Sequence, residues 1–218
     1  MSNKKTKFYD LKDLKSYIDD FEYVYSPLSK THCKFRQEEK YVSNYRNDEA
    51  TMYSAAENEA PEFFYGVNPD EYAWIGLLSK ERYTEGTVAK LHCYYDKFGV
   101  PMIMFADKCN KDEKGNNILD LYHEVVAWEE GCNIWEIKPS QNKAEWNIAP
   151  TLLAEPKFPI ADKEPVEIIV KFGNKEIIAT VNGHKYNLKI ENMPESYHIG
   201  FAICEGIGHF YDFIIETK

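Results

Sequence analysis

One expected strand, residues 118–128, carries the side chains best suited to bind a sugar. Side chains alternate between the two faces of a strand, so Tyr122, Glu124 and Trp128 share one face. Aromatic rings stack on the C–H faces of sugars, and carboxylates accept hydrogen bonds from sugar hydroxyl groups. Trp135 on the next expected strand completes the candidate ligand-binding site; the alternative is that these rings fill the core. The opposite face is mainly apolar and typical of a core: Leu119, Leu121, His123, Val125 and Ala127.

An oxygen-rich loop is the segment most similar to a metal site. Ca²⁺ prefers oxygen ligands, and this loop and its flank offer Asp107, Asn110, Asp112, Asn116 and Asp120. The spacing departs from the EF-hand pattern, because Lys114 and Leu121 stand where ligands are needed. No two histidines lie two or four residues apart, and the sequence has no G-x-S-x-G motif and no glycine-rich phosphate loop. We therefore predict a solvated loop, no metal and no cofactor.

The charge of the chain restricts its partners. The formal net charge is −10, whereas nucleic-acid-binding proteins usually carry a basic patch. The one basic cluster is Lys4, Lys5 and Lys7, so we expect neither a nucleic acid nor a membrane as partner. Residues 1–9 lack the apolar segment of a secretion signal, and we therefore expect a cytoplasmic protein. Five cysteines without a C-x-x-C motif are then expected to be free thiols: Cys33, Cys93, Cys109, Cys132 and Cys204.

The composition favours strands as the elements that position the candidate site. Aromatic residues make up 15% of the chain, and flat rings pack well on pleated sheets. Short runs of period-two alternation are separated by turn residues from about residue 31 onward. The pair Asn182-Gly183 is the strongest hairpin signal, because both central residues of a type I′ turn need positive φ. One short N-terminal helix is expected over residues 10–18, where Leu11, Leu14 and Ile18 have helical spacing.

The number of expected strands sets the fold class. Strands joined by short turns pair in antiparallel fashion, and a sheet of a dozen strands divides into two packed layers. We therefore predict an all-β, two-sheet antiparallel β-sandwich of the jelly-roll type. Residues 1–218 are expected to form a single domain, with residues 1–30 as a peripheral segment that contains the helix.

Two stretches resemble the concanavalin A-like lectin and glucanase superfamily. Residues 166–183 run as strand, short turn and strand ending in Val181-Asn182-Gly183, which is similar to a hairpin of laminin-G-like domains. Residues 199–202 and 208–215 resemble the closing strands of the superfamily, in which a Gly-Phe pair precedes an aromatic-rich strand. The resemblance implies a jelly roll whose concave sheet binds an oligosaccharide or polysaccharide, and this is the first functional hypothesis.

The resemblance also implies an enzymatic alternative. Glucanases of the superfamily carry Glu-x-Asp-x-x-Glu on one strand, and retaining glycosidases need two carboxylates about 5 Å apart. Here Glu124 and Glu129 stand at the two ends of this pattern, but Val126 replaces the central Asp and Glu129 falls in an expected turn. Glu124 is thus the catalytic candidate of a glycoside hydrolase or related sugar-processing enzyme. The third hypothesis is a structural or protein-binding sandwich without a sugar site.

Overall fold

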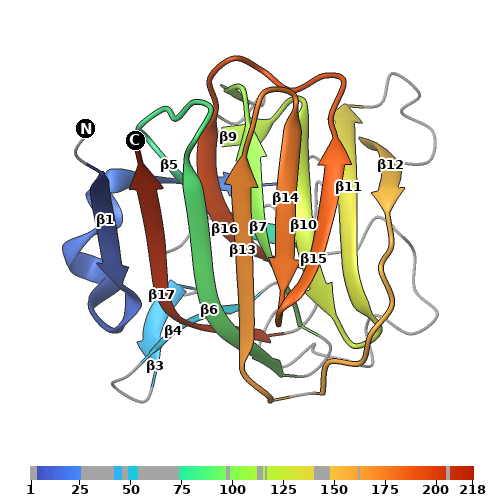
Figure 1. Cartoon of the computed structure of the whole chain (residues 1–218). Coiled ribbons are helices and arrows are strands. Elements are labelled where there is room, and N and C mark those ends of the chain that lie inside the picture. The colour runs from blue at the N-terminus through green and yellow to red at the C-terminus, as the bar shows by residue number, and fades with distance from the viewer. Residues whose placement is uncertain are drawn as a thin grey trace.

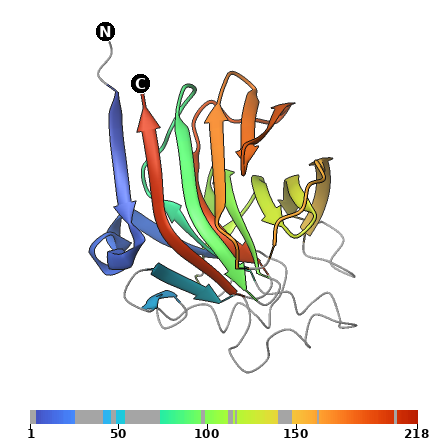
Figure 2. The same ribbon diagram turned by 60° about the horizontal axis from the view of Figure 1, so that its bottom comes forward.

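Two β-sheets packed face to face make up the protein (Figures 1 and 2). The computed structural model describes residues 4–25, 42–45, 49–53, 74–96, 99–111, 115, 117–139, 148–161, 163–204 and 207–218. Within these residues every strand pair is antiparallel except one parallel bridge between Tyr25 and Ile118. The expected all-β, antiparallel two-sheet sandwich is therefore confirmed.

The sheet that carries the candidate site has nine strands. Their order is β12 (Ile148–Ala154), β11 (Gly131–Pro139), β10 (Tyr122–Trp128), β7 (Val100–Ala106), β16 (His198–Cys204), β5 (Trp74–Ser79), β2 (Phe21–Tyr25), β9 (Asn117–Leu119) and β8 (Cys109–Lys111). The β10–β11–β12 end of the sheet is formed by consecutive strands (Figure 1). The candidate residues of β10 and β11 therefore lie close to an edge of the sheet.

The second sheet has eight strands. Its order is β15 (His184–Lys189), β14 (Glu176–Val181), β13 (Val166–Phe172), β6 (Val88–Asp96), β17 (Ile207–Thr217), β4 (Glu49–Tyr53) and β3 (Val42–Tyr45), and β1 (Lys5–Asp10) also pairs with β17. Because β1 and β17 are antiparallel, Lys5 lies opposite Thr217, and the first described strand therefore starts beside the end of the last one (Figure 2).

The hydrophobic core lies between the sheets and follows the alternation of the strands. Val125 and Ala127 of β10 and Ile168 and Val170 of β13 are all fully buried in one cluster. Fully burying a valine or isoleucine side chain stabilises a fold by roughly 1.5–3 kcal/mol. The predicted hairpin turn is also present, since Asn182 has φ 46° and Gly183 has φ 83° between β14 and β15.

The expected N-terminal helix is not an α-helix. Residues 10–18 fall largely in two 3₁₀ turns, Leu11–Ser16 and Ile18–Asp20. Asp13 has φ −118° and ψ 47°, outside the helical region, and its carboxylate accepts a hydrogen bond from the Ser16 hydroxyl. Such local side-chain bonds compete with helix formation, and so short a segment gains little from helix propagation. In the described part of the chain no helix is long and apolar enough to cross a membrane.

Candidate functional site

The two faces of β10 are those that alternation predicted. Val125 and Ala127 point into the core between the sheets. Tyr122 and Val126 belong to a second hydrophobic cluster on the other face, which we call the outer face of the nine-stranded sheet. Directly opposite residues of neighbouring strands share a face, so Trp135, which pairs with Glu124, also lies on the outer face.

The exposure of this face differs from our expectation of an open surface. Tyr122 is 0% exposed and Glu124 is 6% exposed. The cross-strand neighbours of Glu124 are Trp135 and Met104, and the methionine is itself fully buried. Alternation shows which side chains share a face but not whether that face is covered. Tyr122 and Glu124 therefore lie beneath the surface, whereas Trp128 and Trp135 are partly exposed.

The accessible part of the outer face runs over β10, β11 and β12, and we call it the outer strip. Leu152 of β12 lies beside Trp135 and is 41% exposed, one of two large hydrophobic side chains exposed in the described chain. Past a β-bulge at Ile134/Trp135, the register continues to a bridge between Gly131 and Lys157. The outer strip consists of Trp128, Asn133, Trp135, Leu152, Glu155 and Lys157.

One end of the outer strip is a row in which Gly131 lies between Lys157 and Trp128. Because Gly131 has no side chain, Lys157 reaches across it, and the ammonium nitrogen lies 4.6 Å from the centre of the Trp128 ring. The same nitrogen lies 2.8 Å from Glu130 Oε2 and 2.7 Å from Glu155 Oε1. The hydrogen bonds to Glu130 and then Glu155 raise the pKa of Lys157 above its ordinary value.

The backbone around Gly131 requires a glycine. Its φ is 131°, and a Cβ at this position would lie 2.3 Å from the carbonyl oxygen of Pro156. The segment after β12 approaches this closely because it continues the pairing with β11. Cys132 N donates to Pro156 O at 3.0 Å, and Phe158 N donates to Glu130 O at 3.0 Å. These bonds fix Lys157 above the β10–β11 turn.

Two polar atoms of the outer strip are buried without a protein partner, namely Trp128 Nε1 and Asn133 Oδ1. Asn133 pairs with Val126, two residues from Trp128 on the same face. Trp128 Nε1 is a hydrogen-bond donor and Asn133 Oδ1 is an acceptor, and a hydroxyl group can bond to either kind of atom. Sequence analysis missed Asn133, although its parity with Trp135 places it on this face. It also missed Lys157, whose position depends on the β-bulge.

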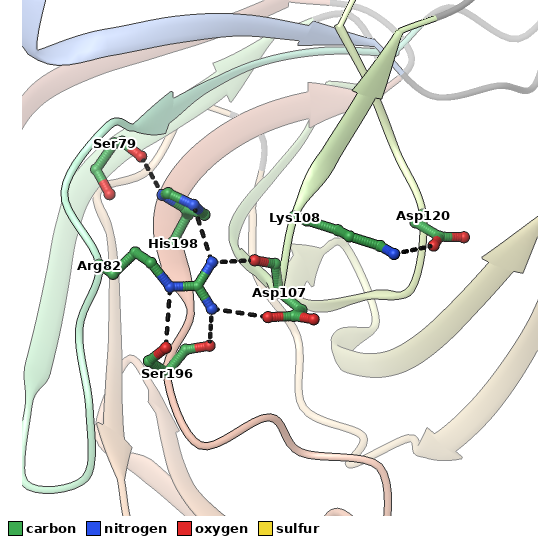
Figure 3. A network of polar contacts seen from close by, with 7 residues as sticks. All are labelled: Ser79, Arg82, Asp107, Lys108, Asp120, Ser196 and His198. Atoms are coloured by element: carbon green, nitrogen blue, oxygen red, sulfur yellow. Dashed lines mark hydrogen bonds and ion pairs between the residues drawn. The ribbon is translucent and has the colours of Figure 1, made fainter.

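A second polar cluster surrounds Arg82 (Figure 3). Nε donates to Ser196 Oγ at 2.9 Å, and Nη2 donates to Asp107 Oδ1 at 2.7 Å and to Ser196 O at 2.5 Å. Nη1 donates to Asp107 O and lies 3.3 Å from His198 Nε2, while His198 Nδ1 lies 2.8 Å from Ser79 O. All five N–H groups of the guanidinium are thus used. This cluster ties together the β5–β6 connection, the end of β7 and the start of β16.

The oxygen-rich loop contributes to the same region. Asp107 is bonded to Arg82, and Asp120 lies 3.6 Å from the ammonium of Lys108 (Figure 3). Asp112 and Asn116 lie outside the described residues. Among the residues that the structure describes, no group of three or more His, Cys, Asp or Glu side chains is arranged to hold a metal ion.

Two histidines outside the outer strip have carboxylate partners. On the eight-stranded sheet, His92 Nδ1 lies 2.6 Å from Asp212 Oδ1 and Nε2 lies 3.3 Å from Glu167 Oε2. Burial acts to lower the pKa of His92, but the bonds to Asp212 and Glu167 outweigh it and the pKa is raised. In the nine-stranded sheet, His123 lies 3.2 Å from Glu136, and there burial dominates and lowers the pKa of His123.

Comparison with known proteins identifies the fold. No family model and no curated protein sequence matches the chain. A Bacillus subtilis protein of unknown function with a galectin-like fold superposes with a TM-score of 0.59 at 12% identity, covering 97% of this chain and 96% of that one. LamA from Z. galactanivorans, in complex with laminaritriose and laminaritetraose, gives 0.55 at 12% identity, with 97% and 98% covered.

A third solved structure gives a TM-score of 0.56 at 12% identity, with 88% of each chain covered. It comes from work on endo-acting O-glycanases that prominent members of the human gut microbiota express to initiate mucin breakdown. At this level of identity the three similarities concern the fold. They confirm the resemblance of the sandwich to concanavalin A-like proteins.

Proposed function

Since the chain has a concanavalin A-like fold, we propose that it binds a carbohydrate at the outer strip. The fold alone does not determine an activity, so the proposal rests on the side chains of the strip. It agrees with the laminarin fragments bound to LamA.

The observation that carries the proposal is the pair of unpartnered atoms, Trp128 Nε1 and Asn133 Oδ1. Leaving a buried polar group without a hydrogen bond costs roughly 1–3 kcal/mol. The two residues stand on the same face of neighbouring strands, and their unpartnered atoms need one hydrogen-bond acceptor and one donor. A sugar hydroxyl meets this need, because its oxygen accepts from the indole N–H and its hydrogen is donated to the amide oxygen.

The remaining side chains have distinct roles in this proposal. Trp135 offers a ring to the C–H face of a sugar, and Leu152 extends the apolar surface beside it. Both nitrogen and oxygen of the unpartnered pair are closed to solvent in the structure. Lys157, which lies over the Trp128 ring and is half exposed, moves aside to admit the ligand. Tyr122 and Glu124 support the strip from beneath rather than touching the ligand.

The proposed activity is binding rather than hydrolysis. Glycoside hydrolysis uses two carboxyl groups about 5–9 Å apart. Glu124 is 6% exposed, and its cross-strand neighbours are Trp135 and Met104, so the pairing of its strand places no second carboxylate beside it. We also propose a cytoplasmic location, because thiols remain reduced there and the four described cysteines are free: Cys93, Cys109, Cys132 and Cys204. Cys33 lies outside the described residues.

A glycan array followed by calorimetric titration tests the proposal. The informative variant is Asn133→Leu, which removes the buried acceptor and keeps a branched side chain with the same number of heavy atoms. We expect affinity for the glycan to fall roughly tenfold to a hundredfold, which corresponds to about 1–3 kcal/mol. The melting temperature should not fall, because the amide oxygen has no protein hydrogen bond to lose.

Asn187→Ala is the matched control, since Asn187 is an exposed asparagine on β15 of the other sheet. It should bind as the wild type does. A wild-type protein that binds no carbohydrate would refute the proposed function. If the glycan affinity of Asn133→Leu equals that of the wild type, the binding site does not lie on the outer strip.

A further inference from the structure

We propose that the ligand is a neutral oligosaccharide of at least three sugar rings, which lies along β10 and β11 with one ring at Trp135 and another at Trp128. This inference rests on the proposed function and specifies the class of ligand for the same site. The register of the strip, the position of the unpartnered atoms and the charge around Lys157 each support it.

The length of the ligand follows from the register of the hairpin. Trp135 lies opposite Glu124, and Trp128 is four residues further along β10 on the same face. Four residues of antiparallel strand span roughly 14 Å. A pyranose ring is about as wide as the six-membered ring of an indole, so one sugar covers only one of the two tryptophans. A ligand that contacts both must contain at least one further ring between them.

The direction of the ligand follows from what lies between the tryptophans. Asn133 occupies the middle of this span, opposite Val126. Val126 is 4% exposed and presents an apolar floor, while Asn133 supplies the unpartnered acceptor. The strip therefore has an aromatic ring at each end and a polar group in the middle. A linear chain of sugars, with hydroxyl groups on the ring edges and C–H groups on the faces, matches this order when it runs along the strands.

The charge of the strip favours a neutral ligand. Lys157 is the cation of the strip, and its ammonium is already shared between Glu130 and Glu155 at 2.8 and 2.7 Å. Two carboxylates around one ammonium leave this end of the strip with a net negative charge. The whole chain has a net charge of −10. A uronate or sulfate group would meet repulsion there, whereas a neutral hydroxyl would not.

The test is a ladder of glycans from one to six rings, in neutral and anionic forms. Neutral probes are glucan, xylan, mannan and galactan fragments, and anionic probes are oligogalacturonides and sulfated galactan fragments. We expect binding to a neutral series only, with affinity rising at least tenfold between one and three rings and then levelling. Equal affinity for one and three rings, or tighter binding of an anionic series, would overturn this inference while leaving carbohydrate binding intact. Binding to no probe would overturn the proposed function itself.

Two variants link the length dependence to Trp135. Trp135→Leu keeps an apolar side chain and is expected to lower affinity for three rings to that for one or two, with little effect on the single sugar. Leu152→Ala removes an exposed side chain of the same row and should weaken three-ring binding less than threefold without loss of melting temperature. Phe8→Ala is the matched control, because Phe8 is an aromatic side chain 54% exposed on β1. A length dependence that survives Trp135→Leu in a folded protein would refute the assignment of Trp135.

Discussion

Lys157 holds its ammonium nitrogen 4.6 Å from the centre of the Trp128 ring, although a strand separates the two residues. The contact is made across Gly131, which bridges to Lys157 on one side and pairs with Trp128 on the other. Because Gly131 has no side chain, Lys157 at the edge of the sheet can contact Trp128 at the aromatic end of the outer strip.

Gly131→Ala is expected to destabilise the protein more than Gly183→Ala. Both glycines have positive φ, at 131° and 83°, and a non-glycine residue in such a conformation costs roughly 1–3 kcal/mol. The Cβ at position 131 would also collide with Pro156 O, whereas the Cβ at position 183 meets nothing within 4 Å. Displacing Pro156 breaks backbone bonds worth about 1 kcal/mol each. Denaturant unfolding of both variants measures the difference, and equal losses would contradict the close approach at Gly131.

Arg82→Lys is expected to lower the free energy of unfolding by roughly 1–3 kcal/mol, because several hydrogen bonds are lost together. A lysine ammonium cannot reproduce the planar fork that reaches Asp107, Ser196 and His198 at once. The partial exposure of Arg82 keeps the expected loss at this modest level. Lys185→Ala, at an exposed position on β15, is the control and should change stability by less than about 0.5 kcal/mol. A loss that small in Arg82→Lys would show that the cluster is not structural.

His92 is expected to make the protein less stable as the pH rises above about 6.5. Its pKa is raised in the folded state, since the bonds to Asp212 and Glu167 outweigh the opposing effect of burial. Its contribution is therefore complete below the unfolded value of about 6.5 and is lost as pH rises through the folded pKa. His92→Gln should flatten the pH dependence of unfolding in that window. If the unfolding free energy of His92→Gln depends on pH as that of the wild type does, the bond between His92 and Asp212 does not contribute to the pH dependence of stability.

His123 is expected to act with the opposite sign. Burial lowers its pKa even though Glu136 acts to raise it. Its contribution is present above about pH 6.5 and is lost as the pH falls through the folded pKa. His123→Gln should therefore reduce the loss of stability as the pH falls below about 6.5, measured by denaturant unfolding at each pH. Proton NMR titration of both imidazoles gives the two pKa values directly, and a raised value for His123 would contradict the dominance of burial.

Cys93, Cys109 and Cys132 are expected to react slowly with thiol reagents in the native protein. Burial raises the pKa of Cys132 to about 12 and that of Cys109 to about 12, and it raises the pKa of Cys93 further. The thiolate is the reactive form, so little of it is present at neutral pH. A titration in denaturant without reductant should count five thiols, including Cys33, for which the presence of a thiol stays a prediction. A count below five would mean that a disulfide forms.

Alternation along the chain predicted the features that depend on neighbours in sequence. It gave the two faces of β10 correctly, and Asn182-Gly183 marked its hairpin turn because positive φ is a local requirement. The burial of Tyr122 depends on packing across strands and was not predictable from its own segment. Lys157 reaches the outer strip only because a bulge near Ile134 shifts the register of β12, and no local pattern marks that shift. The helix predicted over Asp10–Ile18 does not form, because the backbone of Asp13 is not helical and the hydrogen bond between the Ser16 hydroxyl and the Asp13 carboxylate competes with helix formation.

The position of the outer strip at the end of the nine-stranded sheet affects how its parts exchange amide hydrogens with water. In the nine-stranded sheet β12 is the edge strand and pairs only with β11. The amides of β12 that point away from β11 therefore make no hydrogen bond to another described strand of this sheet. Edge elements open locally at a small fraction of the global unfolding free energy. The amides of β12 and of Lys157 should therefore exchange early, while those of β10 and β7 exchange late. A glycan bound along the outer strip would then slow exchange most at the edge, away from the centre of the sheet.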